Sequence, residues 1–245
     1  DEKFGEYRHV KRVEKLIKAA RAKGQKTLSE YESKRVLAAY GVPISREVLV
    51  STQSEAKVAA KKVKYPVVLK GCSADEAHKT EKGLIAVNLG SQAALVDAFK
   101  TISKRAGKHY DGAFLVQEMV SGSREVMIGM HRDPSFGPAV MFGLGGIFTE
   151  ILQDVTFRVA PLRKKDARDM LRSIRGHKIL GAVRGMPAAD LDILCHALMA
   201  VGQVALDHPE IEEIDINPLI IRGSKAVAVD ALIVLSDSEA DGTSS

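Results

Sequence analysis

Apolar and polar residues along the chain follow two periods, one typical of helices and one of strands. Apolar residues spaced three and four apart predict helices over 1–26, from Ser29 to about residue 40, and over 54–64, 92–105, 164–173 and 188–206. Short apolar or alternating runs predict strands over 46–50, 66–70, 84–89, 113–120, 124–133, 138–143 and 147–159. A last hairpin is expected to turn at Arg222-Gly223-Ser224.

The mixture of these elements predicts an α/β or α+β fold with at least one mainly antiparallel sheet. We expect the strand at 124–133 to pair with the strand at 113–120 after the turn Ser121–Ser123. The first third is predicted to form a small subdomain and the remainder a larger one. A cleft between two such pieces is a natural ligand site.

Composition restricts the classes of function. The chain has 245 residues, 45% of them apolar and 27% charged, as in an ordinary globular protein. It has no apolar run near the ~20 residues that span a bilayer and no signal-peptide pattern, so we expect no membrane. The two cysteines, Cys72 and Cys195, fit a reducing interior, and we expect a cytoplasmic protein.

Charge points to an anionic ligand of small size. The formal net charge of +5 suits either a nucleic acid or a polyanion such as ATP. Aromatic residues are only 5% with no Trp, so the stacking platforms of a single-strand binder are missing and we expect no nucleic-acid partner. The chain starts at Asp1, which suggests an engineered start or a piece of a longer polypeptide.

Two basic segments are candidates for binding phosphate. Lys70 ends the apolar strand PVVLK, and a cation there either meets an anion or emerges into solvent. His78, in the loop that follows, could accept a phosphoryl group, because neutral imidazole is a good nucleophile near pH 7. The same loop carries residue types that wrap phosphate without Walker A spacing, namely Lys79, Thr80, Lys82 and Gly83. A charged surface turn is the alternative.

The segment 114–120 and the residues after it could hold a nucleoside. The backbone of Glu118, Met119 and Val120 could pair with the edge of an adenine, and Glu125 is placed for ribose hydroxyls. An ordinary hairpin is the alternative, because backbone pairing needs no particular side chain.

Three glycines within four residues, Gly143, Gly145 and Gly146, require either a close approach or a positive φ. Their spacing does not fit a dinucleotide fold. Of the acids that follow, Glu150 or Asp154 lines a site, or Asp154 caps a helix or pairs with Arg158.

The strongest local feature is Glu213-Ile-Asp215-Ile-Asn217-Pro218. Alternation puts Glu213, Asp215 and Asn217 on one face of a strand, where their oxygens would repel each other unless a cation lies among them. Mg²⁺ prefers such oxygen ligands, with phosphates and waters completing its shell. Asp230 is a lone acid in the next apolar strand, and pairing through the turn would bring it close to Asn217. A solvent-facing polar stripe is the alternative, which explains Asp230 less well.

Read in order, these segments resemble the nucleotide-binding ATP-grasp component of ADP-forming acetyl-CoA or acyl-CoA synthetases, related to the succinyl-CoA synthetase β chain. The resemblance runs from about Leu28 to Leu235. It is carried by YGVP, YPVVLK, AHKTEKG, VQEMV, the long block REVMIGMHRDPSFGPAVMFGLGGIFTEILQDVTFRVAPL, GAVRG, EIDINPL and AVAVDALI. The central block and EIDINPL are specific.

The resemblance implies an ATP-grasp fold of two subdomains with the nucleotide in the cleft between them. We expect a small subdomain (27–111) and a large subdomain (112–235), preceded by an N-terminal helix or linker (1–26). The polar tail SDSEADGTSS (236–245) is expected to be disordered from its composition. The resemblance also implies ATP or ADP and Mg²⁺ as cofactors, with metal ligands Asn217 and Asp230 and with Asp215 nearby.

The remaining roles follow from the same resemblance. Lys70 matches the lysine on nucleotide phosphate, Glu118–Val120 the adenine hinge, and Glu125 the ribose-facing acid. His78 matches the histidine of an HK[ST] motif, implied to be a second phosphoryl carrier. One departure is that Gly83 is followed by Leu84, where the family usually has a second glycine, so this loop is expected to approach the phosphates less closely.

The implied reaction is reversible phosphoryl transfer between phosphohistidine and ADP, which couples acyl-CoA, ADP and phosphate to carboxylic acid, CoA and ATP. The CoA-binding and first-histidine domains are expected on an α subunit or a fused domain, in a hetero-oligomer. The alternative is a nucleotide-sensing domain of a protein lysine acetyltransferase. The presence of both His78 and the Asn217/Asp230 pair favours the ligase component.

Overall fold

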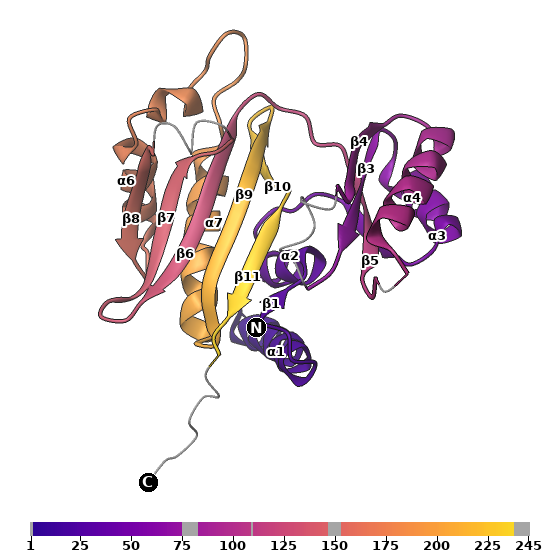
Figure 1. The fold of residues 1–245 in the computed structure, drawn as a ribbon. Helices are drawn as coiled ribbons and strands as arrows, with labels where there is room; N and C mark the ends of the chain where they lie inside the picture. The colour runs from indigo at the N-terminus through magenta and orange to yellow at the C-terminus, as the bar shows by residue number, and fades with distance from the viewer. Residues whose placement is uncertain (1, 75–82, 109, 147–152, 238–245) are drawn as a thin grey trace. The chain divides into compact units, whose positions relative to one another are not determined.

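The computed structural model describes residues 2–74, 83–108, 110–146 and 153–237 (Figure 1). The chain divides into two compact units, each with its own antiparallel sheet. Unit 1 contains residues 1–28, 32–44 and 122–245, and unit 2 contains residues 29–31 and 45–121. The predicted fold class, a mixed α/β structure with antiparallel sheets, is confirmed. None of the described helices is both long and apolar enough to cross a bilayer.

Unit 2 is a four-stranded antiparallel sheet with two helices. The strand order is β2 (Glu47–Val50), β5 (Ala113–Glu118), β3 (Val67–Cys72) and β4 (Ile85–Leu89). Helix α3 (Gln53–Val63) begins with a capping box in which Thr52 and Glu55 satisfy each other's backbone N–H groups. Helix α4 (Gln92–Ala106) is capped by Ser91. Both helices pack on the sheet through small and apolar side chains, including Ala56, Ala60 and Leu95.

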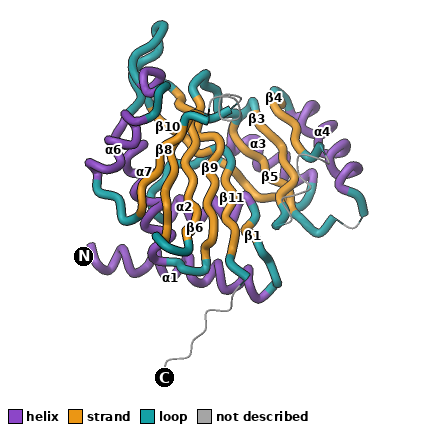
Figure 2. The backbone as a smooth tube through the Cα atoms, turned by 60° about the vertical axis from the view of Figure 1, so that its left-hand side comes forward, coloured by secondary structure: helices purple, strands orange, loops and turns teal. Residues whose placement is uncertain are grey.

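Unit 1 is built on a seven-stranded antiparallel sheet. Its order is β1 (Thr27–Leu28), β11 (Ala231–Leu235), β9 (Ile211–Arg222), β6 (Glu125–Asp133), β7 (Gly137–Leu144) and β8 (Val155–Val159), and β10 (Lys225–Ala228) pairs with β9. Helix α7 (Leu191–Asp207) packs against β6, β7 and β9 on one face of this sheet, with α6 (Lys164–Ser173) beside it (Figures 1 and 2).

The remaining helices of the chain lie near its N-terminus and after α6. Helices α1 (Glu2–Ala22) and α2 (Glu30–Ala39) contribute Val13, Ile17 and Leu37 to the core of unit 1. A short 3₁₀ helix, η2 (His177–Leu180), was not predicted. The strand predicted over 147–159 is described only as β8, Val155–Val159, and residues 147–152 of that prediction lie outside the described residues. The other predicted helices and strands are present, with ends shifted by a few residues.

One predicted pairing is wrong: β5 and β6 do not form a hairpin. β5 lies between β2 and β3 in unit 2, and β6 lies between β7 and β9 in unit 1. Both edges of each strand are already occupied by other partners, so residues 119–124 connect two sheets. Proximity in sequence suggested the hairpin, and long-range pairing overrode it.

The compact units also differ from the predicted ranges 27–111 and 112–235. Unit 2 includes β5 and ends at Ser121 instead of residue 111. Residues 32–44, predicted in the small subdomain, belong to unit 1, where Ala228 N–H donates to the carbonyl of Pro43 at 2.9 Å.

Candidate functional site

Asn217 and Asp230 lie directly opposite each other, as the hairpin prediction required. The β9–β11 register pairs Ile216 with Ala231, and the backbone N–H of Asn217 donates to the carbonyl of Asp230 at 3.2 Å. Asp230 occupies the interruption between β10 and β11. The turn after Arg222 thus brings an amide oxygen and a carboxylate to neighbouring positions of unit 1.

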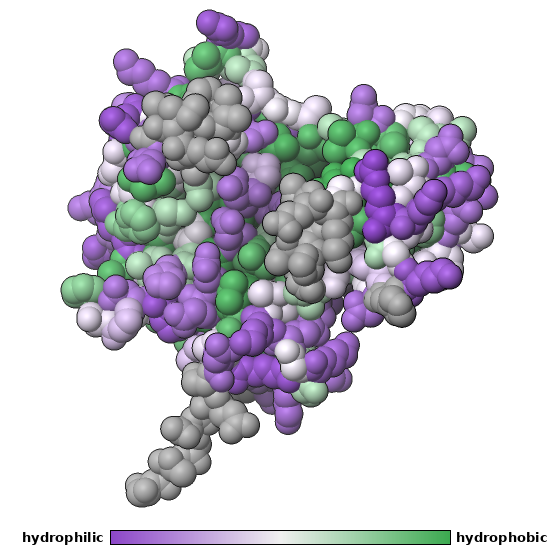
Figure 3. All heavy atoms as spheres, viewed as in Figure 1, coloured by the Kyte–Doolittle hydropathy of each residue, from purple (hydrophilic) through white to green (hydrophobic). Residues whose placement is uncertain are grey.

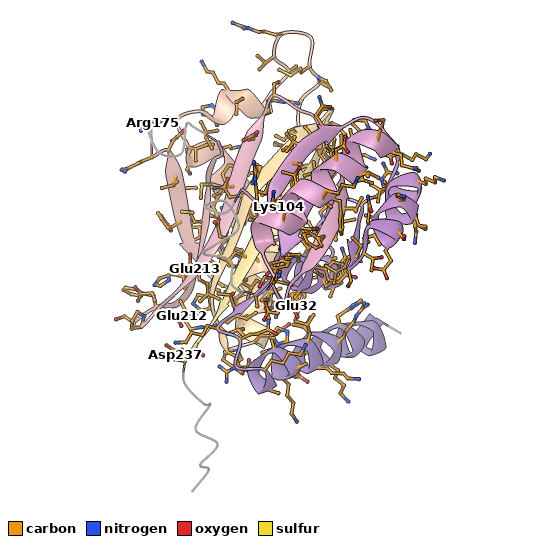
Figure 4. The ribbon with its side chains drawn as sticks, turned by 45° about the vertical axis from the view of Figure 1, so that its right-hand side comes forward. Glu32, Lys104, Arg175, Glu212, Glu213 and Asp237 are labelled. Carbon is orange, nitrogen blue, oxygen red and sulfur yellow. The ribbon has the colours of Figure 1, made fainter. Side chains whose placement is uncertain are left out.

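The predicted alternation along β9 is confirmed. Ile214 and Ile216 are buried in the core of unit 1, while Glu213 and Asn217 are exposed and Asp215 is half-buried on the other face. Figure 4 shows Glu213 near the end of the sheet at which β9 begins. β9 therefore presents its oxygen-bearing side chains on the face opposite its buried isoleucines.

Asp215 lies in an environment that disfavours its negative charge. Burial, followed by the neighbouring carboxylates Glu213 and Asp230, raises the pKa of Asp215 to about 6. A divalent cation would reverse this, because it would favour the ionised carboxylates. The donor set of Asn217, Asp230 and Asp215 is the oxygen chemistry that Mg²⁺ takes. Among the described residues, no three His, Cys, Asp or Glu side chains converge tightly enough to hold a metal by themselves.

The residue beside Asp215 on the neighbouring strand is a glycine, and the methyl group of Met141 lies 3.1 Å from where its Cβ would be. Gly129 of β6 is paired with Asp215 across the sheet. On the more distant β7 and β8, the strand register puts Met141, Phe157 and Val159 on the same face, and Phe157 and Val159 are about half exposed. Figure 3 shows apolar atoms on this side of the molecule, where Figure 1 draws β7 and β8. The open face of this sheet is therefore acidic at β9 and apolar at β8.

In unit 2, Lys70 is buried and ion-paired, not exposed at a strand end. It is 6% exposed, and its Nζ lies 3.2 Å from Oε2 and 3.4 Å from Oε1 of Glu30. Glu30, at the start of α2, is fully buried. The alternative in which Lys70 simply emerges into solvent is wrong. Its contact with nucleotide phosphate stays a prediction.

The segment Glu118–Val120 ends β5 with one unused backbone donor. Glu118 N–H donates to the carbonyl of Arg46 at 2.9 Å, and Met119 N–H donates to that of Pro66 at 3.1 Å. Val120 is 5% exposed, and its N–H has no hydrogen-bond partner among the described residues. Because a buried unpaired N–H is costly, this donor is suited to a ligand acceptor. The alternative of an ordinary hairpin is wrong, because β5 pairs with β2 and β3 and β6 pairs with β7 and β9.

Glu125 begins β6 against the glycine segment. Its carbonyl accepts from Gly145 N–H at 2.9 Å, and a Cβ added at Gly146 would lie 2.8 Å from Oε2 of Glu125. Gly146 also has a φ of +66°. These glycines thus allow the backbone to approach Glu125 closely, as their spacing predicted. The ribose-binding role of Glu125 stays a prediction.

The neighbouring Arg124 fixes three segments around the start of β6. It is 2% exposed, and its two Nη atoms donate to the carbonyls of Ile179, Gly181, Pro187 and Gly223 at 2.7–3.2 Å. We did not predict this residue. The sequence feature that could have indicated it is its position directly before Glu125, a predicted site residue.

Asp154 is a structural acid. It is 7% exposed and accepts from the backbone N–H groups of Arg175 and Gly176 at 2.7 and 2.6 Å, so it caps the segment after α6. The pairing with Arg158 is wrong, because Arg158 donates to Thr156 and to the carbonyl of Phe157. Figure 4 shows Arg175 extending outward beyond α6.

Part of the predicted phosphate loop lies outside the described residues. His78, Lys79, Thr80 and Lys82 fall there, as does Glu150 of the other loop. Gly83 is the first described residue after the loop; it has a φ of +62°, and its carbonyl accepts from Arg105 Nη1 at 3.3 Å. The positive φ agrees with the need for glycine at this position.

Comparison with known proteins assigns the class to which this arrangement belongs. A family model described as an ATP-grasp domain matches residues 19–235. The chain therefore belongs to the ATP-grasp family.

Relatives within the family include ADP-forming CoA ligases. The β subunit of acetate–CoA ligase [ADP-forming] I from Pyrococcus furiosus is 40% identical over 230 residues, which cover 92% of this chain and 99% of that protein. The 4-hydroxybutyrate–CoA ligase [ADP-forming] of Nitrosopumilus maritimus is 40% identical over 214 residues, or 86% of this chain and 31% of that longer protein.

Solved structures give the same picture. The dinucleotide-forming acetyl-coenzyme A synthetase 1 of Ca. Korarchaeum cryptofilum, in complex with coenzyme A and Mg-AMPPCP, has a TM-score of 0.81 and 37% identity. The match covers 91% of this chain and all of that one, and that structure is described as having its phosphohistidine segment pointing towards the nucleotide-binding site. A second structure of the same enzyme, with coenzyme A and Ca-AMPCP, has a TM-score of 0.85.

Proposed function

We propose that this chain is the nucleotide-binding component of an ADP-forming acyl-CoA synthetase. It binds ADP or ATP with Mg²⁺ and carries out reversible phosphoryl transfer between phosphohistidine and the nucleotide. In the full reaction, acyl-CoA, ADP and phosphate give the carboxylic acid, CoA and ATP. The relatives support this activity, since the chain matches a ligase β subunit over nearly its whole length.

The observation that carries the proposal is the juxtaposition of Asn217 and Asp230, with the strained carboxylate of Asp215 beside them. The carboxylates of Asp215 and Asp230 disfavour each other's charge, and a cation beside them would relieve this. Mg²⁺, when bound there with phosphate oxygens completing its shell, would neutralise charge on the transferring phosphoryl group.

Unit 2 supplies the residues proposed for the rest of the nucleotide. Lys70 would face phosphate with an ammonium already held in place by Glu30. The N–H of Val120 would donate to the base. Such prepositioned donors contribute through electrostatics and orientation, which dominate catalysis of phosphoryl transfer. That the two units meet at one nucleotide in a cleft stays a prediction.

The proposed phosphoryl relay uses His78. A phosphohistidine of the partner delivers the group to a ring nitrogen of His78 and the partner histidine leaves; a terminal phosphate oxygen of ADP then takes the group from His78, which leaves in turn. The partner would be a CoA-binding α subunit or a fused domain, consistent with relatives of which this chain covers about a third. The acetyltransferase-domain alternative gains no support, because the relatives described above are ligases.

A labelling experiment tests the relay. The chain is mixed with Mg²⁺, ADP and a phosphorylated partner subunit carrying ³²P on histidine, and label is followed onto ATP. We expect His78→Ala to keep ADP affinity near that of the unchanged chain and to abolish transfer. Full transfer by the variant would reduce His78 to an ordinary loop residue.

A further inference from the structure

Both oxygens of the carboxylate at the proposed base-binding segment accept hydrogen bonds from Arg46. Oε1 of Glu118 accepts from the backbone N–H of Arg46 at 2.9 Å, and Oε2 accepts from Nε at 3.1 Å and Nη2 at 2.8 Å. The Glu118 side chain is 6% exposed, whereas that of Arg46 is 58% exposed. A largely exposed arginine thus holds a buried acid by two side-chain bonds and one backbone bond, a bidentate geometry that is strong and directional.

The backbone N–H groups of Glu118 and Met119 in the same segment also have hydrogen-bond partners within unit 2. Arg46 also accepts the N–H of Glu118, and Pro66 accepts that of Met119, so the N–H of Val120 is the donor left over in this segment of the described chain. The segment can therefore donate one backbone N–H, that of Val120, to a nucleobase. Its carboxylate, Glu118, already accepts hydrogen bonds from Arg46.

This pattern distinguishes between purines. Adenine has an acceptor at N1, which a single N–H can satisfy. Guanine and hypoxanthine carry a proton at N1, and a carboxylate is the side chain that best accepts it. An N–H facing an N1–H leaves both donors unpaired, which is costly in a buried place.

We infer that Arg46 is a specificity-determining residue: by occupying Glu118 it makes this segment select adenine over guanine and hypoxanthine nucleotides. The inference rests on the proposed function, since it concerns the base of the same nucleotide. Arg46 acts through Glu118 and is a positioning residue.

The first test uses the unchanged 245-residue chain and four diphosphates with Mg²⁺, each measured by calorimetric titration. We expect IDP and GDP to bind about 10- to 100-fold more weakly than ADP, as expected when buried donors are mismatched. The ADP analogue 1-deaza-ADP, which lacks the N1 acceptor, should bind about tenfold more weakly than ADP. Binding of ADP, IDP and GDP within twofold of one another would overturn the inference.

The second test compares Arg46→Met with Arg46→Lys. Arg46→Met removes the guanidinium that holds both oxygens of Glu118, so the ratio of IDP to ADP dissociation constants should fall by at least about fivefold. Arg46→Lys keeps a cation beside Glu118 and should retain most of the ratio. Arg172→Met, at an exposed position of α6, serves as the control with an unchanged ratio. An equal weakening of ADP and IDP by Arg46→Met would show a purely structural role and overturn the inference.

These outcomes separate the inference from the function on which it rests. Tight, Mg²⁺-dependent binding of all purine diphosphates would leave the proposed function standing and remove the role of Arg46. Binding of none of them would remove the function itself. If Arg46→Met does not fold, the nucleotide series on the unchanged chain decides alone.

Discussion

The buried acids Glu30 and Glu118 of unit 2 lie beside cations, whereas Asp215 on β9 of unit 1 lies beside other acids. In unit 2, Glu30 and Glu118 each face a cation of the same unit, Lys70 and Arg46. In unit 1, the carboxylate of Asp215 has Glu213 and Asp230 as its charged neighbours, and its pKa is raised to about 6. Two kinds of charge arrangement therefore coexist in one chain.

The difference separates buried charges that are neutralised by a partner in the fold from like charges that a bound cation would neutralise. A paired buried charge is already balanced, and removing one partner leaves the other uncompensated. A group of like charges is costly until a cation arrives. The buried acids Glu30 and Glu118 of unit 2 thus have cations of their own unit beside them, whereas the acids on β9 of unit 1 are where we propose that a cation binds.

The largest expected effect is that of Glu30→Ala. The change removes the carboxylate beside the buried ammonium of Lys70, and breaking such a pair costs about 3–5 kcal/mol. Urea unfolding measures this as a lowered midpoint. Asp97→Ala, at an exposed position of α4, is the matched control and should change little. A variant as stable as the unchanged chain would contradict the idea that unit 2 balances its charges internally.

A smaller effect of opposite sign is expected for Asp215→Asn. Because the pKa of Asp215 is raised in the folded state, the folded form binds a proton more readily than the unfolded form. The stabilising effect of that proton is fully present below about pH 4 and is lost as pH rises through about 6. Asparagine removes the repulsion, so at pH 7.5 without metal we expect about 1 kcal/mol of added stability, after allowance for solvent screening.

The pH series provides the check on Asp215→Asn. Urea midpoints between pH 4 and 7.5 should fall more steeply with rising pH for the unchanged chain than for the variant. Parallel curves would mean that Asp215 is not strained by its neighbours. Added Mg²⁺ and ADP should stabilise the unchanged chain at pH 7.5 more than they stabilise the variant.

The smallest effect is expected at an exposed ion pair. Arg168 donates to Asp192 at 2.8 Å, but both side chains are well exposed, and solvent and salt screen such pairs. Arg168→Ala should leave the urea midpoint of the chain and its ADP affinity within error. A large loss would show that surface charge matters more here than the comparison of the two units allows.

The sequence predicted features that depend on local periodicity. Strict alternation placed Asp215 and Asn217 on one face of β9, and a short turn was enough to bring Asp230 opposite Asn217. The glycines at 145 and 146 were correctly expected to allow a close approach.

The features that were missed depend on long-range contacts. Glu30 lies 40 residues from Lys70, and no spacing rule connects a helix start with the end of a strand. Likewise, β5 and β6 are neighbours in sequence but belong to different sheets, because each found two better partners elsewhere. The clamp formed by Arg124 joins segments up to 99 residues away.

The metal dependence of ADP binding tests the central claim most directly. Asp230→Asn retains the shape of the side chain and removes its charge, and titration of ADP with and without Mg²⁺ measures the contribution of the metal. We predict that Mg²⁺ lowers the dissociation constant of ADP for the unchanged chain. In the variant, the factor by which Mg²⁺ lowers this constant should be at least about tenfold smaller, while the urea midpoint stays the same. An equal gain from Mg²⁺ in both proteins would contradict the assignment of the cation to Asn217 and Asp230.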